Sequence, residues 1–401
     1  MSLRHPCRRL GKFKAAFELR YGKNMFPKIM DLYHFPTLNM ISYRKDLFDK
    51  AGIANIPRTW EELYEVMMVL KDAYPESYPT YFPLVADIIN TWSYMFGTGP
   101  TVYLNEKTGK WTCGPIEENS KKMIKWLAQC YKDKLTTQDF IKPDAQKQSR
   151  QKLGVEEPIS ILFENTWASA YKTTAIERGA PSDFEYQYMD PLTWENGEGG
   201  KLTMWCPVIG SGWAVSLNSK KKDAAFKLFD FLYSQEGTAW ASFGPADLGI
   251  TTSVKSENGV PPKPGEPFWL SPKWLDPSIP FTENVYNATG FLQIFPACRW
   301  QDNTDIDAYP EVYAITKKML DANKSYSYFE LPSSALTTEQ FERFNAVFTN
   351  ANDTAMVFFE KCIIGSANVD EGWDKFVSDM KKFGIDEILK MLDEASSKLA
   401  K

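Results

Sequence analysis

The chain has 401 residues, of which 43% are hydrophobic and 24% charged, so we expect a folded globular protein of two to three domains, not a disordered chain. Its 46 basic and 51 acidic side chains leave a net charge of −5 without a long run of one sign, which argues against a nucleic-acid partner. Unbroken apolar runs such as Val66–Leu70 are far shorter than the roughly 20 residues needed to cross a bilayer.

Two residue counts argue against common catalytic and metal sites. His5 and His34 are the only histidines, which excludes a histidine-rich zinc site and disfavours histidine catalysis. The six cysteines, at positions 7, 113, 130, 206, 298 and 362, are at least 17 residues apart, so no CxxC spacing occurs. We therefore predict no catalytic residue, no metal site and no cofactor, and we expect the cysteines to pack as small hydrophobic side chains.

The first half of the chain predicts alternating strands and helices. After a basic segment, residues 1–24, that lacks the apolar stretch of a secretory signal, Met40–Tyr43 has the pattern of a strand. Thr59-Trp60-Glu61-Glu62 is a capping box that opens a helix, and Tyr81–Ala86 is the next expected strand. Together these elements predict a β-α-β unit and an architecture of parallel strands with crossover helices.

The same alternation continues towards the middle of the chain, where the pattern predicts further helices and strands. The predicted helices are Glu118–Lys134, Asn165–Arg178 and Ala225–Leu232, and the predicted strands are Pro158–Phe163 and Trp213–Leu217. Residues 256–284 contain seven prolines and are expected to form an ordered surface loop.

After Tyr309 the pattern predicts helices only. Thr337-Thr338-Glu339-Gln340 and Asn368-Val369-Asp370-Glu371 open two of them, and a break is expected near Gly384. Trp60 and Trp373 fall on amphipathic helix faces, so both are assigned to the core.

Three stretches resemble the bacterial extracellular solute-binding proteins of family 1, the maltose-binding type. The first is YRKDLFDKAGI at residues 43–53, followed by PRTWEEL at 57–63. The second is GWAVS at 212–216, followed by SKKKDAA at 219–225 and LYSQEG at 232–237. The third is the tail, with FFEK at 358–361, WDKF at 373–376 and FGIDEI at 383–388, which is similar to the closing helices of larger, lipoprotein-type members.

The resemblance implies an α/β, two-lobe periplasmic-binding-protein-like (type II) fold with a hinge and a helical C-terminal segment. Residues 1–36 would be a remnant of lobe one, 37–214 lobe two, 215–298 the second segment of lobe one with the proline-rich loop, and 299–401 C-terminal helices on lobe two. The implied function is the extracytoplasmic substrate-binding component of an ABC importer, with a carbohydrate ligand, an interlobe cleft lined by aromatic rings, and permease subunits as partners. The family also implies a signal peptide and a lipid anchor in a full-length protein; this sequence shows neither.

The sequence departs from the family pattern in two places. Arg44 stands where an Asn is usual, which leaves the strand prediction intact. Only 42 residues precede Tyr43, whereas family members have most of the first lobe before this point, so we expect the first lobe to be incomplete or remodelled.

The resemblance also implies ligand contacts, because sugar sites pair aromatic rings with carboxylate and amide hydrogen-bonding groups. Trp167, after Asn165, matches the position of a stacking tryptophan, and Trp92 falls near another interlobe aromatic. Tyr33 and His34 would lie at the first hinge crossing. Weaker candidates are Trp205, Trp300 and Asp302. For each of these residues a structural role in the core is the alternative.

Two other classes of function remain open. Aromatic residues beside carboxylates also build the clefts of carbohydrate-active hydrolases, although no pair of acidic residues stands out here. A cell-surface adhesion protein would instead present exposed aromatic rings to a polysaccharide. Turnover assays separate the first alternative from a binding protein, and ligand size separates the second.

Overall fold

The computed structural model describes residues 37–142, 159–165, 179–181, 183–205, 215–216, 218–232, 314–315, 318–319, 322, 325–327 and 331–399. The chain divides into two compact units. Unit 1 comprises Met1–Pro36 and Pro207–Tyr313, and unit 2 comprises Thr37–Cys206 and Ala314–Lys401. The lobe boundaries expected from the sequence stay a prediction.

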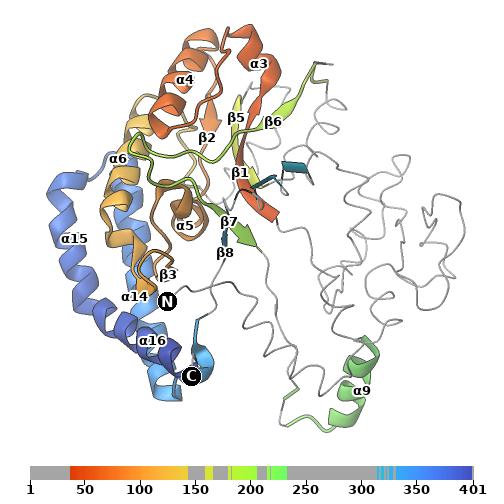
Figure 1. Ribbon diagram of the computed structural model, residues 1–401, viewed down its shortest axis with the longest axis vertical. Helices are drawn as coiled ribbons and strands as arrows, with labels where there is room; N and C mark the ends of the chain where they lie inside the picture. Colours follow the sequence, from red (N-terminus) through yellow and green to blue (C-terminus); the bar gives the residue numbers. More distant parts are fainter. Residues whose placement is uncertain are drawn as a thin grey trace, which may run out of the picture. The chain divides into compact units, whose positions relative to one another are not determined.

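Unit 2 contains a mixed six-stranded sheet (Figure 1). The strand order is β2-β5-β1-β7-β8, and β6 also pairs with β1. The strands are β1 (Thr37–Arg44), β2 (Thr80–Tyr81), β5 (Ile161–Asn165), β6 (Tyr186–Tyr188), β7 (Leu202–Trp205) and β8 (Ser325–Ser327). A separate hairpin is formed by β3 (Tyr103–Asn105) and β4 (Lys110–Thr112).

The strand β1 is the centre of this sheet. It pairs antiparallel with β5 along most of its length, with Met40 opposite Glu164 and Tyr43 opposite Ile161. Its other side is shared by two strands: β7 pairs with the first residues of β1, and β6 pairs with the last. Met40 and Ile41 are both buried although neighbouring side chains of a strand point to opposite faces, so both faces of β1 are covered there.

Helices of unit 2 gather around this sheet, and α6, α14, α15 and α16 pack together as one group (Figure 1). The described α-helices of unit 2 with defined bounds are α3 (Lys45–Lys50), α4 (Trp60–Ala73), α5 (Val85–Asp87), α6 (Glu118–Lys132), α14 (Thr338–Ile363), α15 (Val369–Phe383) and α16 (Ile385–Leu399). Shorter turns are the π-helix η1 (Ile88–Trp92) and the 3₁₀ helices η2 (Ser93–Phe96), η3 (Gly114–Ile116) and η9 (Ser333–Ala335).

Local sequence signals set several helix ends as predicted. Thr59 and Thr337 both form complete capping boxes, at the starts of α4 and α14. Asn368 caps α15 by accepting hydrogen bonds from two backbone N–H groups. Gly384 adopts φ +102° between α15 and α16, a left-handed conformation that favours glycine. These predicted ends are confirmed.

The core of unit 2 is rich in aromatic rings. Trp60 has no exposed surface, and its ring stacks on Phe96 with centroids 3.7 Å apart. The ring centroid of Trp194 lies 6.1 Å from that of Trp60. Trp373 on α15 is also buried, and its ring centroid lies 6.3 Å from that of Phe358 on α14. The assignment of Trp60 and Trp373 to the core is therefore confirmed, as is the burial of Cys113, Cys130 and Cys362 as free thiols.

Three predictions about the strands are wrong. The strand expected over Tyr81–Ala86 ends at Tyr81, because Pro83 has no N–H to continue a ladder and α5 begins at Val85. The β-α-β unit is not parallel: β5 lies between β1 and β2, runs antiparallel to β1 and runs parallel to β2. The segment after Tyr309 is not only helical, because β8 adds a strand parallel to β7.

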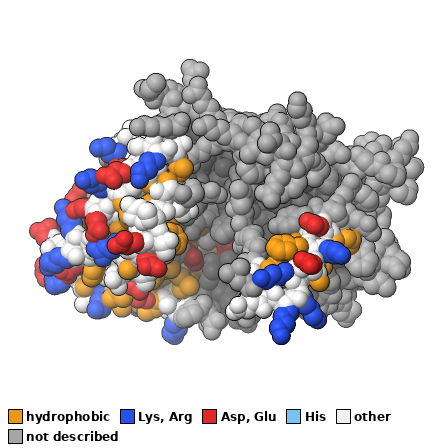
Figure 2. All heavy atoms as spheres, turned by 90° about the horizontal axis from the view of Figure 1, so that it is seen from below, with side chains coloured by type: hydrophobic (Ala, Val, Ile, Leu, Met, Phe, Trp, Pro, Cys, Tyr) orange, Lys and Arg blue, Asp and Glu red, His pale blue; other side chains and the backbone are white. Residues whose placement is uncertain are grey.

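Unit 1 is described mainly through α9 (Lys222–Leu232), a helix that the sequence predicted. This helix exposes apolar side chains, including Phe226, Leu228 and Phe231, between charged residues (Figure 2). The predicted helix over 165–178 and strand over 213–217 fall largely outside the described residues, although Asn165 itself ends β5. Among the described helices, none is both long and apolar enough to span a membrane.

Candidate functional site

Three neighbouring strands of unit 2 each have one end at the same edge of the sheet, the edge formed by strand ends. The strand β1 begins there at Thr37, whereas β5 and β7 end there at Asn165 and Trp205. The antiparallel register puts Asn39 opposite Asn165, and Thr37 opposite Trp205. Two boundaries between the units, 36/37 and 206/207, also lie here. We call this place, with the helical turn beside it, the crossing edge.

The turn beside it is η1, a π-helix held against both outgoing strands. The hydroxyl of Thr203 on β7 donates a hydrogen bond to the carbonyl of Thr91. The indole of Trp92 packs edge-on against Phe163 on β5, with ring centroids 5.1 Å apart. Thr203 and Phe163 each precede the end of their strand by two residues. Since π-turns occur frequently at functional sites, this placement singles out η1.

Polar side chains lie at the crossing edge in positions that solvent reaches. Asn90 is exposed, and Asn39, Asp87 and Thr91 are half-buried. These groups offer amide, carboxylate and hydroxyl functions, which donate or accept hydrogen bonds with neutral polar molecules. Asp87 and Asn90 were not among the ligand contacts predicted from the sequence. Their spacing of three residues directly before Trp92 was the available signal.

The structure places three of the eight residues predicted to contact the ligand. Asn165 and Trp205 are brought to the crossing edge by the ends of β5 and β7. Trp92 is there too, but only 4% of its surface is exposed because it packs on Phe163. The other five lie outside the described residues: Tyr33, His34, Trp167, Trp300 and Asp302. Ligand contact stays a prediction for all eight.

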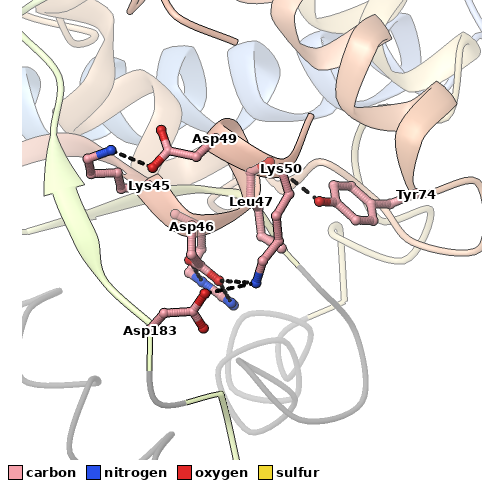
Figure 3. Close-up of polar contacts among 8 residues, drawn as sticks. Lys45, Asp46, Leu47, Asp49, Lys50, Tyr74 and Asp183 are labelled. Atoms are coloured by element: carbon pink, nitrogen blue, oxygen red, sulfur yellow. Dashed lines mark hydrogen bonds and ion pairs between the residues drawn. The ribbon is translucent and has the colours of Figure 1, made fainter. Parts of the chain in front are cut away.

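A second polar cluster lies at the opposite end of β1 (Figure 3). Arg44 donates two hydrogen bonds to Asp46, at 2.6 and 2.5 Å, and its guanidinium lies 4.0 Å from the centre of the Phe184 ring. The Lys50 ammonium lies 3.1 Å from a carboxylate oxygen of Asp183 and 3.8 Å from one of Asp46. We call these charged residues, Arg44, Asp46, Lys50 and Asp183, the ion-pair end.

The geometry of the ion-pair end is that of a structural cluster. Arg44 and Asp46 are almost fully buried, and the bidentate contact satisfies the carboxylate from within the protein. Lys50 lowers the pKa of Asp183, chiefly through their hydrogen bond. Burial raises the pKa of Tyr74, whose hydroxyl donates to the Leu47 carbonyl at 3.4 Å. Arg44, the departure from the family's usual Asn, is thus compensated by Asp46 and Phe184.

A further carboxylate, that of Glu117, is half-buried beside the β3-β4 hairpin. Glu117 accepts hydrogen bonds from the hydroxyls of Thr98, at 2.6 Å, and Tyr103, at 3.0 Å. Burial raises the pKa of Glu117, and these hydrogen bonds oppose the shift. All three residues belong to one internal network, so we assign it to structure. Across the described ranges, no group of three or more His, Cys, Asp or Glu side chains has the arrangement of a metal site.

Comparisons with known proteins decide the family. Residues 14–239 match the bacterial extracellular solute-binding protein family. The chain belongs to this family. A search of curated proteins finds no match to it.

Solved structures agree with this assignment at the level of the fold. The alginate-binding protein AlgQ2, in a crystal structure without calcium ion, is 18% identical, with a TM-score of 0.67 over 96% of this chain and 78% of AlgQ2. An extracellular solute-binding protein from Bifidobacterium longum subsp. infantis is 16% identical, with a TM-score of 0.64 over 97% and 81% of the two chains. FusA from S. pneumoniae, an EF-hand mutant in complex with fructo-nystose, is 15% identical, with a TM-score of 0.64 over 96% and 81%. The mixed α/β, periplasmic-binding-protein-like fold is therefore confirmed.

Family membership also settles the class of function. The protein is an extracellular solute-binding protein, from a family whose members bind solutes and are not enzymes. The prediction of a binding protein is confirmed at this level, and the hydrolase alternative is not retained.

Proposed function

We propose that this protein binds a neutral oligosaccharide at the crossing edge of unit 2 and delivers it to the permease subunits of an ABC importer. One observation carries the proposal. The sheet register puts Asn39 at the edge where the chain passes between its two units, and the Thr203–Thr91 hydrogen bond holds η1, which contains Asn90 and Thr91 and directly follows Asp87, beside that edge.

The chemistry of these side chains favours a sugar. Sugar hydroxyls both donate and accept hydrogen bonds, and amide and carboxylate groups provide matching partners. Two predicted ligand contacts, Trp167 two residues after the end of β5 and Trp205 at the end of β7, would supply flat apolar surfaces for the sugar rings. The described polar residues named above include the carboxylate of Asp87, which would repel the carboxylates of an acidic sugar, so we propose a neutral ligand.

The relatives support a carbohydrate ligand without identifying it. AlgQ2 is named for binding alginate, and FusA was solved with fructo-nystose. We extend the proposal to the remaining predicted contacts, Tyr33, His34, Trp300 and Asp302, and to the two-lobe organisation expected from the sequence. An extracytoplasmic location, with a lipid anchor on the full-length protein, is part of the same proposal.

Calorimetric titration with a matched panel tests the ligand class. The panel contains neutral fructo-, gluco- and galacto-oligosaccharides, alginate oligosaccharides, and a neutral polysaccharide of high molecular mass. We expect saturable binding of at least one neutral oligosaccharide and none of alginate fragments. Preference for the long polymer would favour the adhesion alternative, and a complete lack of sugar binding would contradict the proposal.

A further inference from the structure

A carboxylate is buried one residue before the end of β5. Glu164 is only 3% exposed, and its Oε1 accepts a hydrogen bond of 2.5 Å from the hydroxyl of Tyr81, which is itself 1% exposed. Burying a carboxylate is unfavourable unless hydrogen bonds compensate the loss of water. A Glu at this buried position therefore needs a structural or functional reason, whereas an apolar residue would not.

The Tyr81 contact extends the pairing of two strands beyond their backbone ladder. The strands β2 and β5 run parallel, and their last paired residues are Tyr81 and Leu162. The hydroxyl of Thr80 already donates to the Ile161 carbonyl at 2.8 Å. The Tyr81–Glu164 hydrogen bond then holds β5 two residues further on, next to Asn165.

The opposite side of β5 is held by β1, with Met40 opposite Glu164 and Asn39 opposite Asn165. At Glu164 the strand is thus fixed from both sides, by the register of β1 and by the side chain of Tyr81. Asn165 is the last residue of β5, and the predicted stacking residue Trp167 follows two positions later in the sequence. A hydrogen bond is directional, so this pair fixes the end of β5 more closely than apolar packing alone would.

We infer that Tyr81 and Glu164 are positioning residues that set the end of β5 for ligand binding without touching the ligand. This inference rests on the proposed function, because it assigns the pair to the site at the crossing edge. Preorganisation of a binding site raises affinity by reducing the ordering required when the ligand binds. Loss of the hydrogen bond should therefore weaken binding more than it weakens the fold.

The chain offers a matched control with the same chemistry. The hydroxyl of Tyr64 on α4 donates to Asp133, directly after α6, at 2.6 Å. Neither α4 nor α6 contributes a residue to the crossing edge. Tyr64→Phe and Tyr81→Phe each remove one hydroxyl from a tyrosine–carboxylate pair. The pairs differ in where they lie and in burial, since Tyr81 is 1% exposed and Tyr64 is half-buried, so stability is measured beside affinity.

The experiment compares affinity and stability in four variants of the whole protein, with the tightest neutral oligosaccharide of the panel as the probe. We expect Tyr81→Phe to weaken binding by about tenfold and Tyr64→Phe to leave it within twofold of the unchanged protein. Glu164→Gln keeps an acceptor for Tyr81 and should lose less than threefold. Glu164→Leu packs without an acceptor, so it should lose about tenfold even if its thermal midpoint is equal or higher.

Two results would overturn the inference: equal affinities of Tyr81→Phe and Tyr64→Phe, or an affinity loss that follows the loss of stability in all four variants. A ligand-free measurement separates this failure from failure of the proposed function. Hydrogen exchange at the amides of Glu164 and Asn165 should accelerate in Tyr81→Phe but not in Tyr64→Phe. Faster exchange in a protein that binds no sugar would contradict the function alone, and unchanged exchange would contradict the positioning role.

Discussion

The two ends of β1 use polar residues in opposite ways. At the ion-pair end, Arg44 and Asp46 pair with each other in the interior, and Phe184 covers the guanidinium. At the crossing edge, Asn39 and Asn90 occupy positions that solvent reaches, beside strand ends where the chain changes unit. The strand β1 thus has, at one end, charged side chains that pair with each other and, at the other end, solvent-accessible polar side chains that can bind a ligand.

The comparison separates polar residues that stabilise the fold from polar residues that are available to bind a ligand. A buried ion pair is strongly coupled to folding, because removal of one partner leaves the other charge uncompensated. Exposed amides and hydroxyls contribute little to folding and remain available for binding. Variants at the two ends should therefore divide into those that change stability and those that change affinity.

The largest expected effect is at the ion-pair end. Arg44→Ala should lower the free energy of unfolding by about 3–5 kcal/mol, because the buried Asp46 carboxylate loses its partner. Replacing both residues together, with Arg44→Met and Asp46→Leu, should recover most of that loss. Urea denaturation measures both effects. A single variant as stable as the unchanged protein would contradict the structural role of the pair.

A variant of Trp167 tests the predicted ligand binding. This residue is chosen from the sequence resemblance alone, because it lies outside the described residues. Trp167→Ala should weaken oligosaccharide binding tenfold or more, because aromatic stacking contributes about 0.5–1.5 kcal/mol in addition to the buried area. Its effect on stability should be small. A large loss of stability with unchanged affinity in the folded fraction would assign Trp167 to the core.

A smaller change in affinity is expected at η1. Asn90→Ala removes an exposed amide, and the loss of one hydrogen bond of about 0.5–1.5 kcal/mol corresponds to about a two- to tenfold weaker affinity. Asp49→Ala, an exposed residue that pairs with Lys45 on α3, is the control and should bind normally. Titration calorimetry of both variants decides the question, and equal affinities would remove Asn90 from the site.

The smallest effect concerns acid stability at the ion-pair end. Lys50 lowers the folded-state pKa of Asp183, so this pair stabilises the fold above the unfolded pKa of about 3.9 and loses that contribution as pH falls through the lower folded value. Both side chains lie largely in water, so the effect is small. Asp183→Asn should lose slightly less stability than the unchanged protein between pH 5 and pH 2 in urea titrations. Identical pH profiles would contradict this contribution.

The sequence predicted what depends on neighbouring residues. The capping boxes at Thr59 and Thr337 and the glycine turn at Gly384 are local signals, and each was found in its place. Pairing across the sheet depends on distant segments, so the antiparallel placement of β5 beside β1 and the strand β8 could not be read from periodicity.

The candidate site likewise combines residues that were predicted from the sequence with residues that only long-range contacts reveal. Trp92, Asn165 and Trp205 were singled out by the resemblance, and the ends of β5 and β7 bring the last two together. Asp87 and Asn90 were missed because their spacing before Trp92 does not reveal the π-helical turn, or its hydrogen bond to Thr203, that holds this segment beside the strand ends. The Tyr81–Glu164 contact was equally invisible, since it depends on the parallel pairing of β2 with β5.

The most direct test of the central claim measures where an oligosaccharide binds. The double variant Asp87→Ala, Asn90→Ala, the control variant Asp49→Ala and the unchanged protein are titrated in parallel with the tightest neutral oligosaccharide of the panel. Denaturation curves first confirm that all three proteins are folded. We predict that the double variant loses at least tenfold in affinity, whereas the control matches the unchanged protein. Equal affinity in all three proteins would show that the crossing edge is not the ligand site.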